Sequence, residues 1–257
     1  MQETRLRSQS ESNDEQMIYG IRPAMEAILA GKEIEKIYIT RGSRGDLMQE
    51  LKQLMRDRKI LYSEVPIEKL NRLTRKNHQD VVCFISSVTY QSIEDIVPAI
   101  FEKGETPLLL ILDRITDVRN FGAIARTAEC AGVQAIVIPY KGAAQVNADA
   151  VKTSAGALNS IPVCREKNLL HTIAFLKESG LQVIAATEKT SEPHYEADFS
   201  APCAIIMGSE EDGISTDLLK LADKKIKIPL LGSIKSLNVS VACGVVLFEA
   251  LRQRGNG

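Results

Sequence analysis

Residues 108–138 have the sequence LLLILDRITDVRNFGAIARTAECAGVQAIVI, and this stretch decides the fold. The unbroken apolar run LLLIL at 108–112 predicts a buried β-strand, and AIVI at 135–138 predicts a second one. Between them, the residue pattern over 120–131 favours a helix. Continuous apolar strands that alternate with helices are typical of a parallel sheet with both faces covered, so we predict an α/β domain.

The same alternation continues toward the end of the chain. We predict further strands at 183–186, 204–207 and 224–228, and helices at 166–178, 215–222 and 238–254. In parallel sheets, ligands bind outside the carboxyl ends of the strands. The loops that follow these strands are rich in Gly, Ser, Asn and charged residues, and they lie at 113–120, 139–143, 187–190, 208–213 and 229–238. Any one of them alone is more often an ordinary turn, but together they are the candidate region for a site.

The N-terminal third is organised differently. Residues 17–90 are predicted to form a compact α/β module, with helices near 21–29, 46–58 and 66–73 and strands near 36–39, 60–65 and 81–86. Residues 1–16 lack apolar periodicity, so we expect a disordered tail. Residues 91–106 are predicted to form a helix and a charged linker. The domain boundary then falls at Thr106-Pro107, and the second domain covers 107–257.

The composition excludes several classes of protein. The 257 residues are 44% hydrophobic and 25% charged, which excludes a disordered, collagen-like or disulfide-rich chain. The run LLLIL is far shorter than the ~20 residues that a membrane span needs. No apolar signal segment is present in residues 1–16. The five cysteines stand apart without a CxxC pair, so we expect reduced thiols in a cytoplasmic protein.

The charge is unevenly distributed along the chain. The whole sequence has 32 Lys and Arg against 33 Asp and Glu, a net charge of −1. Residues 17–90 carry thirteen basic and nine acidic residues, a net charge of +4. An excess of this size is more often a solvated surface, but it makes the N-terminal module the better candidate for binding a polyanion.

The motifs of the common nucleotide-binding and hydrolytic enzymes are missing. No GxGxxG follows a strand and no GxxxxGK[ST] occurs, which argues against a Rossmann dehydrogenase and a P-loop NTPase. No GxSxG is present, so Ser209 is predicted to be a turn residue and not a nucleophile. The three histidines lie far apart in the sequence without partners at ligand spacing, so we expect no metal site.

Two segments at the predicted strand ends carry candidate site residues. In DVRNFGAIARTAECAG (117–132), Asn120 stands where it could cap the helix, and Arg126 could form a surface ion pair. The small residues of this helix allow a neighbour or a ligand to approach closely. In IMGSEEDGIS (206–215), Gly208 and Gly213 flank three acidic residues. These glycines allow close backbone approach or positive φ, although three adjacent acids usually form a solvated turn.

A third segment is IPLLGSIKSLNVSVACGVVLFEA (228–250), in which a strand, a loop and a long apolar helix follow one another. Ser236 or Asn238 can cap this helix. We expect Val241, Val245 and Phe248 to face the core and to serve in packing.

Together, NFGAIARTA (120–128), GSEEDG (208–213) and IPLLGSIKSLNVSVA (228–242) resemble, in this order, the three signature motifs of the SpoU (TrmH) family of RNA 2′-O-methyltransferases. YGIRPAMEAIL (19–29) and NHQDVVCF (77–84) resemble the substrate-binding domain of the ribosomal-RNA branch of that family. The resemblance covers nearly the whole chain from Met17. Asp80 and Glu211 depart from the pattern, because the family usually has glycine at the first position and often at the second.

The resemblance implies an enzyme that methylates a ribose 2′-hydroxyl of ribosomal RNA with S-adenosylmethionine, at a guanosine of 23S rRNA. It implies a deep trefoil knot in the parallel-sheet domain, although knots are essentially absent from other folds. A homodimer with active sites at its interface, without metal or membrane, is also implied. The cofactor contacts carried over by the resemblance are Thr187, Gly208, Ile228 and Leu237.

The resemblance assigns catalytic roles to Asn120, Arg126, Glu210 and Asn238. Because a guanidinium has a pKa above ~12, we expect Arg126 to hold the target phosphate and hydroxyl and not to act as a base. The two asparagines would orient the hydroxyl and the loops, and Glu210 would hold Arg126 or Asn120. Two other functions stay open. The N-terminal domain argues against a tRNA methyltransferase of the same family, and the intact motif residues argue against a non-catalytic RNA-binding assembly factor.

Overall fold

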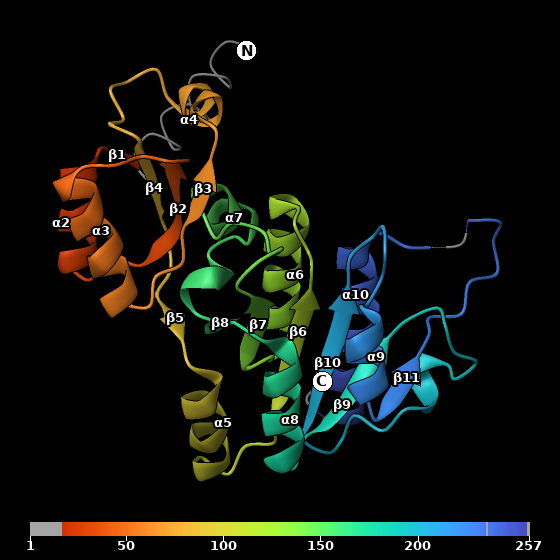
Figure 1. The fold of residues 1–257 in the computed structure, drawn as a ribbon. Helices are drawn as coiled ribbons and strands as arrows, with labels where there is room; N and C mark the ends of the chain where they lie inside the picture. The colour runs from red at the N-terminus through yellow and green to blue at the C-terminus, as the bar shows by residue number, and fades with distance from the viewer. Residues whose placement is uncertain (1–16, 235, 256–257) are drawn as a thin grey trace. The chain divides into compact units, whose positions relative to one another are not determined.

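The computed structural model describes residues 17–234 and 236–255, and the chain forms two compact units (Figure 1). The first unit runs to Thr89 and includes Val146–Ala148, and the second contains Tyr90–Gln145 and the residues from Asp149 onward. Each unit combines a β-sheet with α-helices, as the sequence predicts. No helix in the described part of the chain is long and apolar enough to cross a membrane.

The first unit is a four-stranded mixed sheet of order β1-β4-β2-β3. Strand β4 runs antiparallel to β1 and β2, and β3 runs parallel to β2. Helices α2 and α3 pack with Ile37 and Ile39 on one face, and α4 packs near Tyr38 and Val82 on the other. The elements are β1 (Met17–Tyr19), α2 (Ile21–Leu29), β2 (Ile34–Thr40), α3 (Asp46–Asp57), β3 (Ser63–Val65), α4 (Ile67–Leu73) and β4 (Val81–Ile85). Strand β1 is not predicted from the sequence.

The second unit contains a seven-stranded sheet in which every pair of neighbouring strands is parallel, with the order β11-β9-β10-β6-β7-β8-β5. All six residues of β6 are buried, so both faces are covered, as predicted. The strands are β5 (Tyr90–Gln91), β6 (Leu108–Asp113), β7 (Ala135–Pro139), β8 (Val163–Glu166), β9 (Gln182–Ala186), β10 (Cys203–Gly208) and β11 (Lys224–Ile226). The helices are α5 (Ile93–Glu102), α6 (Val118–Cys130), α7 (Ala148–Thr153), η1 (Ala157–Asn159), α8 (Leu169–Glu178), η2 (His194–Glu196), α9 (Thr216–Leu221) and α10 (Val239–Gln253).

Strand β6 is the point at which the sheet is extended in both directions. Strands β7 and β8 lie on one side of β6, and β10, β9 and β11, which come later in the chain, lie in this spatial order on the other side. Strands β6 and β10 are therefore neighbours, and Asp113 lies opposite Gly208 at their carboxyl ends. The loops that leave these two strands begin side by side, and in open parallel sheets the point where the strand order reverses is where ligands bind.

Residues 91–106 group with the second unit, and the helix predicted within this range is α5. Strand β5 pairs with β8 at the edge of the sheet, and α5 contributes Ile93, Val97 and Ile100 to the core. The charged residues that suggest a connector, such as Glu94 and Glu102, lie on the exposed side of this amphipathic helix.

The buried face of α10 also differs from the predicted one. Val241 and Phe248 are 53% and 51% exposed and do not face the core. The buried side chains are instead those of Val239, Cys243, Val246, Leu247 and Ala250. Because this helix is apolar nearly all round, its periodicity does not single out one face, and packing against α6 decides which side is buried.

Candidate active site

The turn that follows β10 folds back so tightly that only glycine fits at position 208. A Cβ atom on Gly208 would overlap the backbone of Gly213 and Ile214. The N–H of Gly213 donates to the carbonyl of Ser209 at 2.9 Å, and Gly213 has a φ of 66°, in the left-handed region. Ser209 Oγ accepts from the N–H of Asp212 at 3.2 Å, so this serine supports the turn, as predicted.

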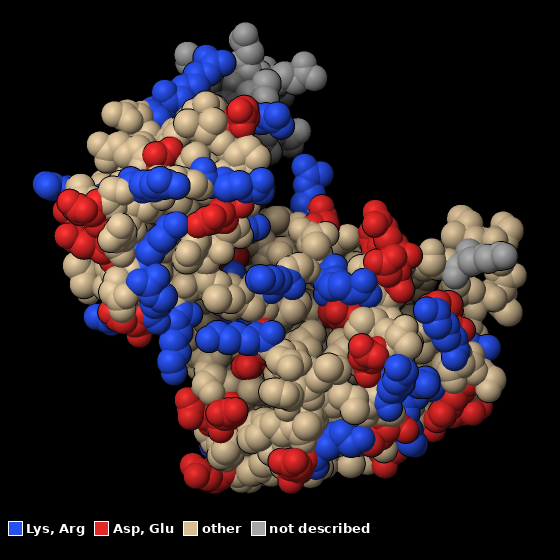
Figure 2. All heavy atoms as spheres, in the orientation of Figure 1, with Lys and Arg blue, Asp and Glu red and all other residues tan. Residues whose placement is uncertain are grey.

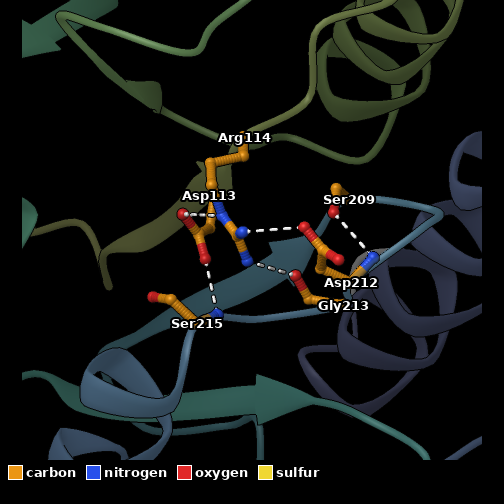
Figure 3. Close-up of polar contacts among 6 residues, drawn as sticks. All are labelled: Asp113, Arg114, Ser209, Asp212, Gly213 and Ser215. Carbon is orange, nitrogen blue, oxygen red and sulfur yellow. Dashed lines mark hydrogen bonds and ion pairs between the residues drawn. The ribbon is translucent and has the colours of Figure 1, made fainter.

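Asp113 and Arg114 join this turn to the end of β6 (Figure 3). The buried carboxylate of Asp113 accepts from the N–H of Ser215 at 2.7 Å and from Arg114 Nε at 3.3 Å. The other two guanidinium nitrogens of Arg114 donate to Asp212 Oδ2 at 3.0 Å and to the carbonyl of Gly213 at 3.1 Å. Neither Asp113 nor Arg114 is predicted as a site residue. The available signal is an acidic residue directly after five apolar ones, since a buried carboxylate needs partners.

Three of the four predicted catalytic residues lie together at the carboxyl ends of β6 and β10. Asn238 Nδ2 donates to Asn120 Oδ1 at 3.0 Å and to Glu210 Oε1 at 2.6 Å. The backbone N–H of Val239 donates to the same oxygen of Glu210 at 3.2 Å. In this arrangement Glu210 contacts Asn120 through Asn238, and not directly.

Of the two asparagines, Asn238 caps its helix and Asn120 does not. Asn238 caps α10, because its Oδ1 accepts from the N–H of Ser240 at 3.0 Å, and this agrees with one of the two predicted caps. Asn120 does not cap α6. The helix begins one residue after Asp117, whose carboxylate accepts from the N–H of Asn120 at 2.7 Å. The side chain of Asn120 is therefore available for the contact with Asn238.

Two cavities lie beside the turn at 208–213. The larger has a volume of about 740 Å³, and its lining includes all four predicted cofactor contacts, Thr187, Gly208, Ile228 and Leu237. The smaller has a volume of about 400 Å³ and is lined by Asn120 and the loops after β6 and β10. Residues 209–212 and Val239 line both cavities, so the two cavities adjoin along these residues.

Arg126 lies apart from these residues. It is exposed on α6, lines neither cavity, and has no hydrogen-bond or ion-pair partner among the residues that the structure describes. The small residues of α6 do allow a close neighbour, as predicted. A Cβ atom on Gly122 would lie 2.6 Å from Thr153 Cβ, so α7 packs directly against the helix backbone.

Two family models together match most of the chain. A model described as the SpoU rRNA Methylase family matches residues 107–248, and one described as RNA 2′-O ribose methyltransferase substrate binding matches residues 17–91. The 23S rRNA (guanosine-2′-O-)-methyltransferase RlmB of Vibrio parahaemolyticus is 37% identical over 248 residues, which are 93% of this chain and 97% of that protein. YacO of Bacillus subtilis, assigned to the TrmH family of tRNA/rRNA methyltransferases, is 32% identical over 243 residues, 95% of this chain and 98% of that protein.

Solved structures show the same architecture. The crystal structure of an rRNA methyltransferase from Sinorhizobium meliloti with bound S-adenosylmethionine has a TM-score of 0.60 and 28% identity to this chain. The similarity covers 92% of this chain and 87% of that one. Fold and site thus define an RNA 2′-O-ribose methyltransferase with an N-terminal substrate-binding domain. The chain belongs to the SpoU family.

Proposed function

We propose that this protein methylates a ribose 2′-hydroxyl of ribosomal RNA, at a guanosine of 23S rRNA, with S-adenosylmethionine as the methyl donor. The observation that carries the proposal is the pair of cavities that adjoin along residues 209–212 and Val239. A donor in the larger cavity and a nucleoside in the smaller one would bring the methyl group and the 2′-hydroxyl together where the two cavities meet. The 37% identity to an enzyme named for guanosine methylation in 23S rRNA supports the choice of RNA.

The larger cavity fits S-adenosylmethionine. It is lined by both polar and apolar groups, and at Gly208 no side chain stands between the ligand and the backbone. Thr187, Ile228 and Leu237 would contact the cofactor together with Gly208. When bound, S-adenosylmethionine supplies a methyl group on a positively charged sulfur, so the protein has mainly to position the hydroxyl.

In this proposal, Asn120 orients that hydroxyl. It lines the smaller cavity, and its Oδ1 is held by Asn238, which Glu210 fixes in turn. Asn238 and Glu210, both distant from Asn120 in the sequence, thereby hold the Asn120 amide in a single orientation. Such preorganisation lowers the barrier because the ordering is complete before the substrate binds.

A homodimer explains the position of Arg126. In its own chain Arg126 lies outside both cavities, so we propose that it holds the target phosphate and hydroxyl in the active site of the partner. The exposed apolar residues of α10, Val241 and Phe248, are spaced with Val245 on one face of the helix, and α10 packs beside α6. A second copy of the chain would cover this apolar stripe.

Hybrid dimers test the homodimer. Arg126→Ala disables the arginine and Gly208→Ala disables the cofactor cavity, so neither variant should methylate RNA by itself. Mixed after dissociation and reassociation, they form hybrids with one intact site, and about a quarter of the wild-type activity should return. If the mixture stays as inactive as its components, Arg126 does not act across an interface.

We also propose that the parallel-sheet domain contains a deep trefoil knot. Family membership supports it, and so does the insertion of β10 between β9 and β6. Pulling the chain apart from its two ends with optical tweezers tests it. The unfolded chain should be shorter than an unknotted chain of equal length, and a full contour length would rule the knot out.

Methyl transfer to defined RNAs tests the enzymatic function. The purified protein should transfer labelled methyl groups to unmodified 23S rRNA, with chelator present, and the label should map to the 2′-oxygen of a guanosine. Preferential labelling of tRNA would support the tRNA methyltransferase instead. Binding of RNA without transfer to either substrate would support the assembly factor.

A further inference from the structure

Four chain segments meet at one end of the first unit. Strand β2 ends at Thr40 beside the end of β3, and its antiparallel neighbour β4 begins at the same end. Strand β1 also ends here, because Tyr19 lies opposite Val82 near the start of β4. The loops 41–45 and 74–80 and the start of α2 therefore lie at this end of the sheet.

The two loops are joined and held in shape by hydrogen bonds. The N–H of Thr40 donates to the carbonyl of Asp80 at 3.0 Å, and Ser43 Oγ donates to Asp80 Oδ2 at 3.2 Å. Buried His78 accepts from the N–H of Asp80 at Nδ1, which leaves Nε2 to donate to Asn71 Oδ1 at 2.9 Å. The loop shape is thus fixed by the protein itself before any ligand binds.

These segments carry a group of positive charges, which we call the cationic end: Arg22, Arg41, Arg44, Arg75 and Lys76. All five side chains are exposed. The four guanidinium groups have no hydrogen-bond or ion-pair partner in the described part of the chain. The ammonium of Lys76 lies 5.1 Å from the ring centroid of Tyr19, which keeps its charge at this end.

The acidic residues on these segments are few. Asp46 begins α3 at this end, and the carboxylate of Asp80 already accepts a hydrogen bond from Ser43. Asp80 has a φ of 66°, a conformation that glycine adopts freely and aspartate tolerates. In Figure 2, Lys and Arg side chains spread across the visible surface of the first unit, in which residues 17–90 carry a net charge of +4.

We propose that the cationic end binds the phosphate backbone of the substrate RNA. Unpaired arginines suit this ligand, because a guanidinium donates two parallel hydrogen bonds to one phosphate. Neutralising phosphates also releases counterions, which favours binding at low salt. The inference rests on the proposed function and goes beyond it, since it names the surface that holds the RNA outside the active site.

A charge-matched pair of full-length variants tests the cationic end. The first carries Arg41→Gln, Arg44→Gln and Arg75→Gln. The control carries Lys32→Gln, Arg58→Gln and Lys59→Gln, which remove three exposed cations at the opposite end of the sheet, where β2 begins and α3 ends. Filter binding to an unmodified 23S rRNA transcript is measured over a series of salt concentrations, together with melting temperature and S-adenosylmethionine affinity.

The first variant should bind the transcript at least ~10-fold more weakly at low salt, and its slope of log K against log salt should be shallower by about 2–3. The control should stay within about twofold of the wild type. Both variants should keep the wild-type melting temperature and cofactor affinity. Equal losses in the two variants, or wild-type binding by the first, would overturn the proposal. Failure of the wild-type protein to methylate any RNA would count against the proposed function, while the binding comparison would still decide whether this end holds RNA.

Discussion

The Arg126 side chain has no hydrogen-bond or ion-pair partner in the described part of its own chain, so its loss should affect chemistry more than stability. Arg126→Ala should leave the melting temperature and cofactor affinity unchanged. Turnover should fall by ~10²–10⁴, equivalent to ~3–5 kcal/mol in the barrier. Arg126→Lys should restore little, since an ammonium lacks the planar two-pronged geometry. Single-turnover methyl transfer to 23S rRNA measures the effect. Near-normal turnover would remove Arg126 from the mechanism, and lost cofactor binding would make its role structural.

Gly208 is constrained by its neighbours and not by its own φ. Gly208→Ala should destabilise the protein by ~1–3 kcal/mol, because the added Cβ meets backbone atoms of Gly213 and Ile214 that cannot move aside easily. The matched control is Gly232→Ala, since a Cβ there has nothing within 4 Å. Thermal unfolding measures the stability of both variants. An unchanged melting temperature for Gly208→Ala would mean that the turn is looser than its geometry indicates.

At the scale of the element, α10 is tied to the rest of its unit at both ends. Asn238 links its start to α6 and the turn after β10. Near its end, the amide of Gln253 accepts from the N–H of Phe199 at 2.8 Å and donates to the carbonyl of Ala197 at 2.9 Å. Gln253 Nε2 also donates to Glu249 Oε1 at 2.7 Å. Protonation of the Glu249 carboxylate at low pH should therefore weaken the contacts at this end of the helix.

Glu249 gives α10 a stability that depends on pH. Hydrogen bonds from Arg252 and Gln253 lower the pKa of Glu249 from its ordinary value of 4.5 to about 2. A carboxylate whose pKa is lower in the folded state stabilises the fold above its ordinary pKa, and this contribution is lost as the pH falls toward 2. The melting temperature of Glu249→Gln should therefore fall less than that of the wild type between about pH 5 and pH 2. Parallel curves for the two proteins would contradict the assignment.

At the scale of the whole molecule, we expect the first unit to bind RNA and the second to carry out the chemistry. Deleting residues 1–89, up to the start of β5, should leave S-adenosylmethionine affinity close to that of the full chain, because the cofactor cavity lies entirely in the second unit. RNA affinity should drop, and its salt dependence should become shallower, because the net positive charge lies in the deleted part. Calorimetric titration and filter binding measure the two effects. Methylation of the same RNA at the full rate by the shortened chain would show that the first unit does not select the substrate.

Residues 91–106, which follow the deleted part, show a limit of prediction from sequence. The charges of residues 91–106 suggest a connector, yet β5 and α5 complete the second unit. Charge on one side of a helix does not reveal what the other side packs against. The faces of α10 are a second case, because a helix that is apolar nearly all round has no preferred side until its neighbours are in place.

The sequence by itself determined the alternation of strands and helices, the parallel sheet with both faces covered, and the three motifs that point to the SpoU family. These are local properties, since a run of apolar residues or a motif is complete within a few turns of chain. Only the tertiary structure decided that Asn238 meets Asn120, 118 positions away, and that Asp113 and Arg114 hold the turn after β10. It also decided that Arg126 lies outside both cavities of its own chain. The physical reason is that such contacts depend on strand order. The insertion of β10 beside β6 brings distant loops to one edge of the sheet, and no local pattern encodes that neighbour.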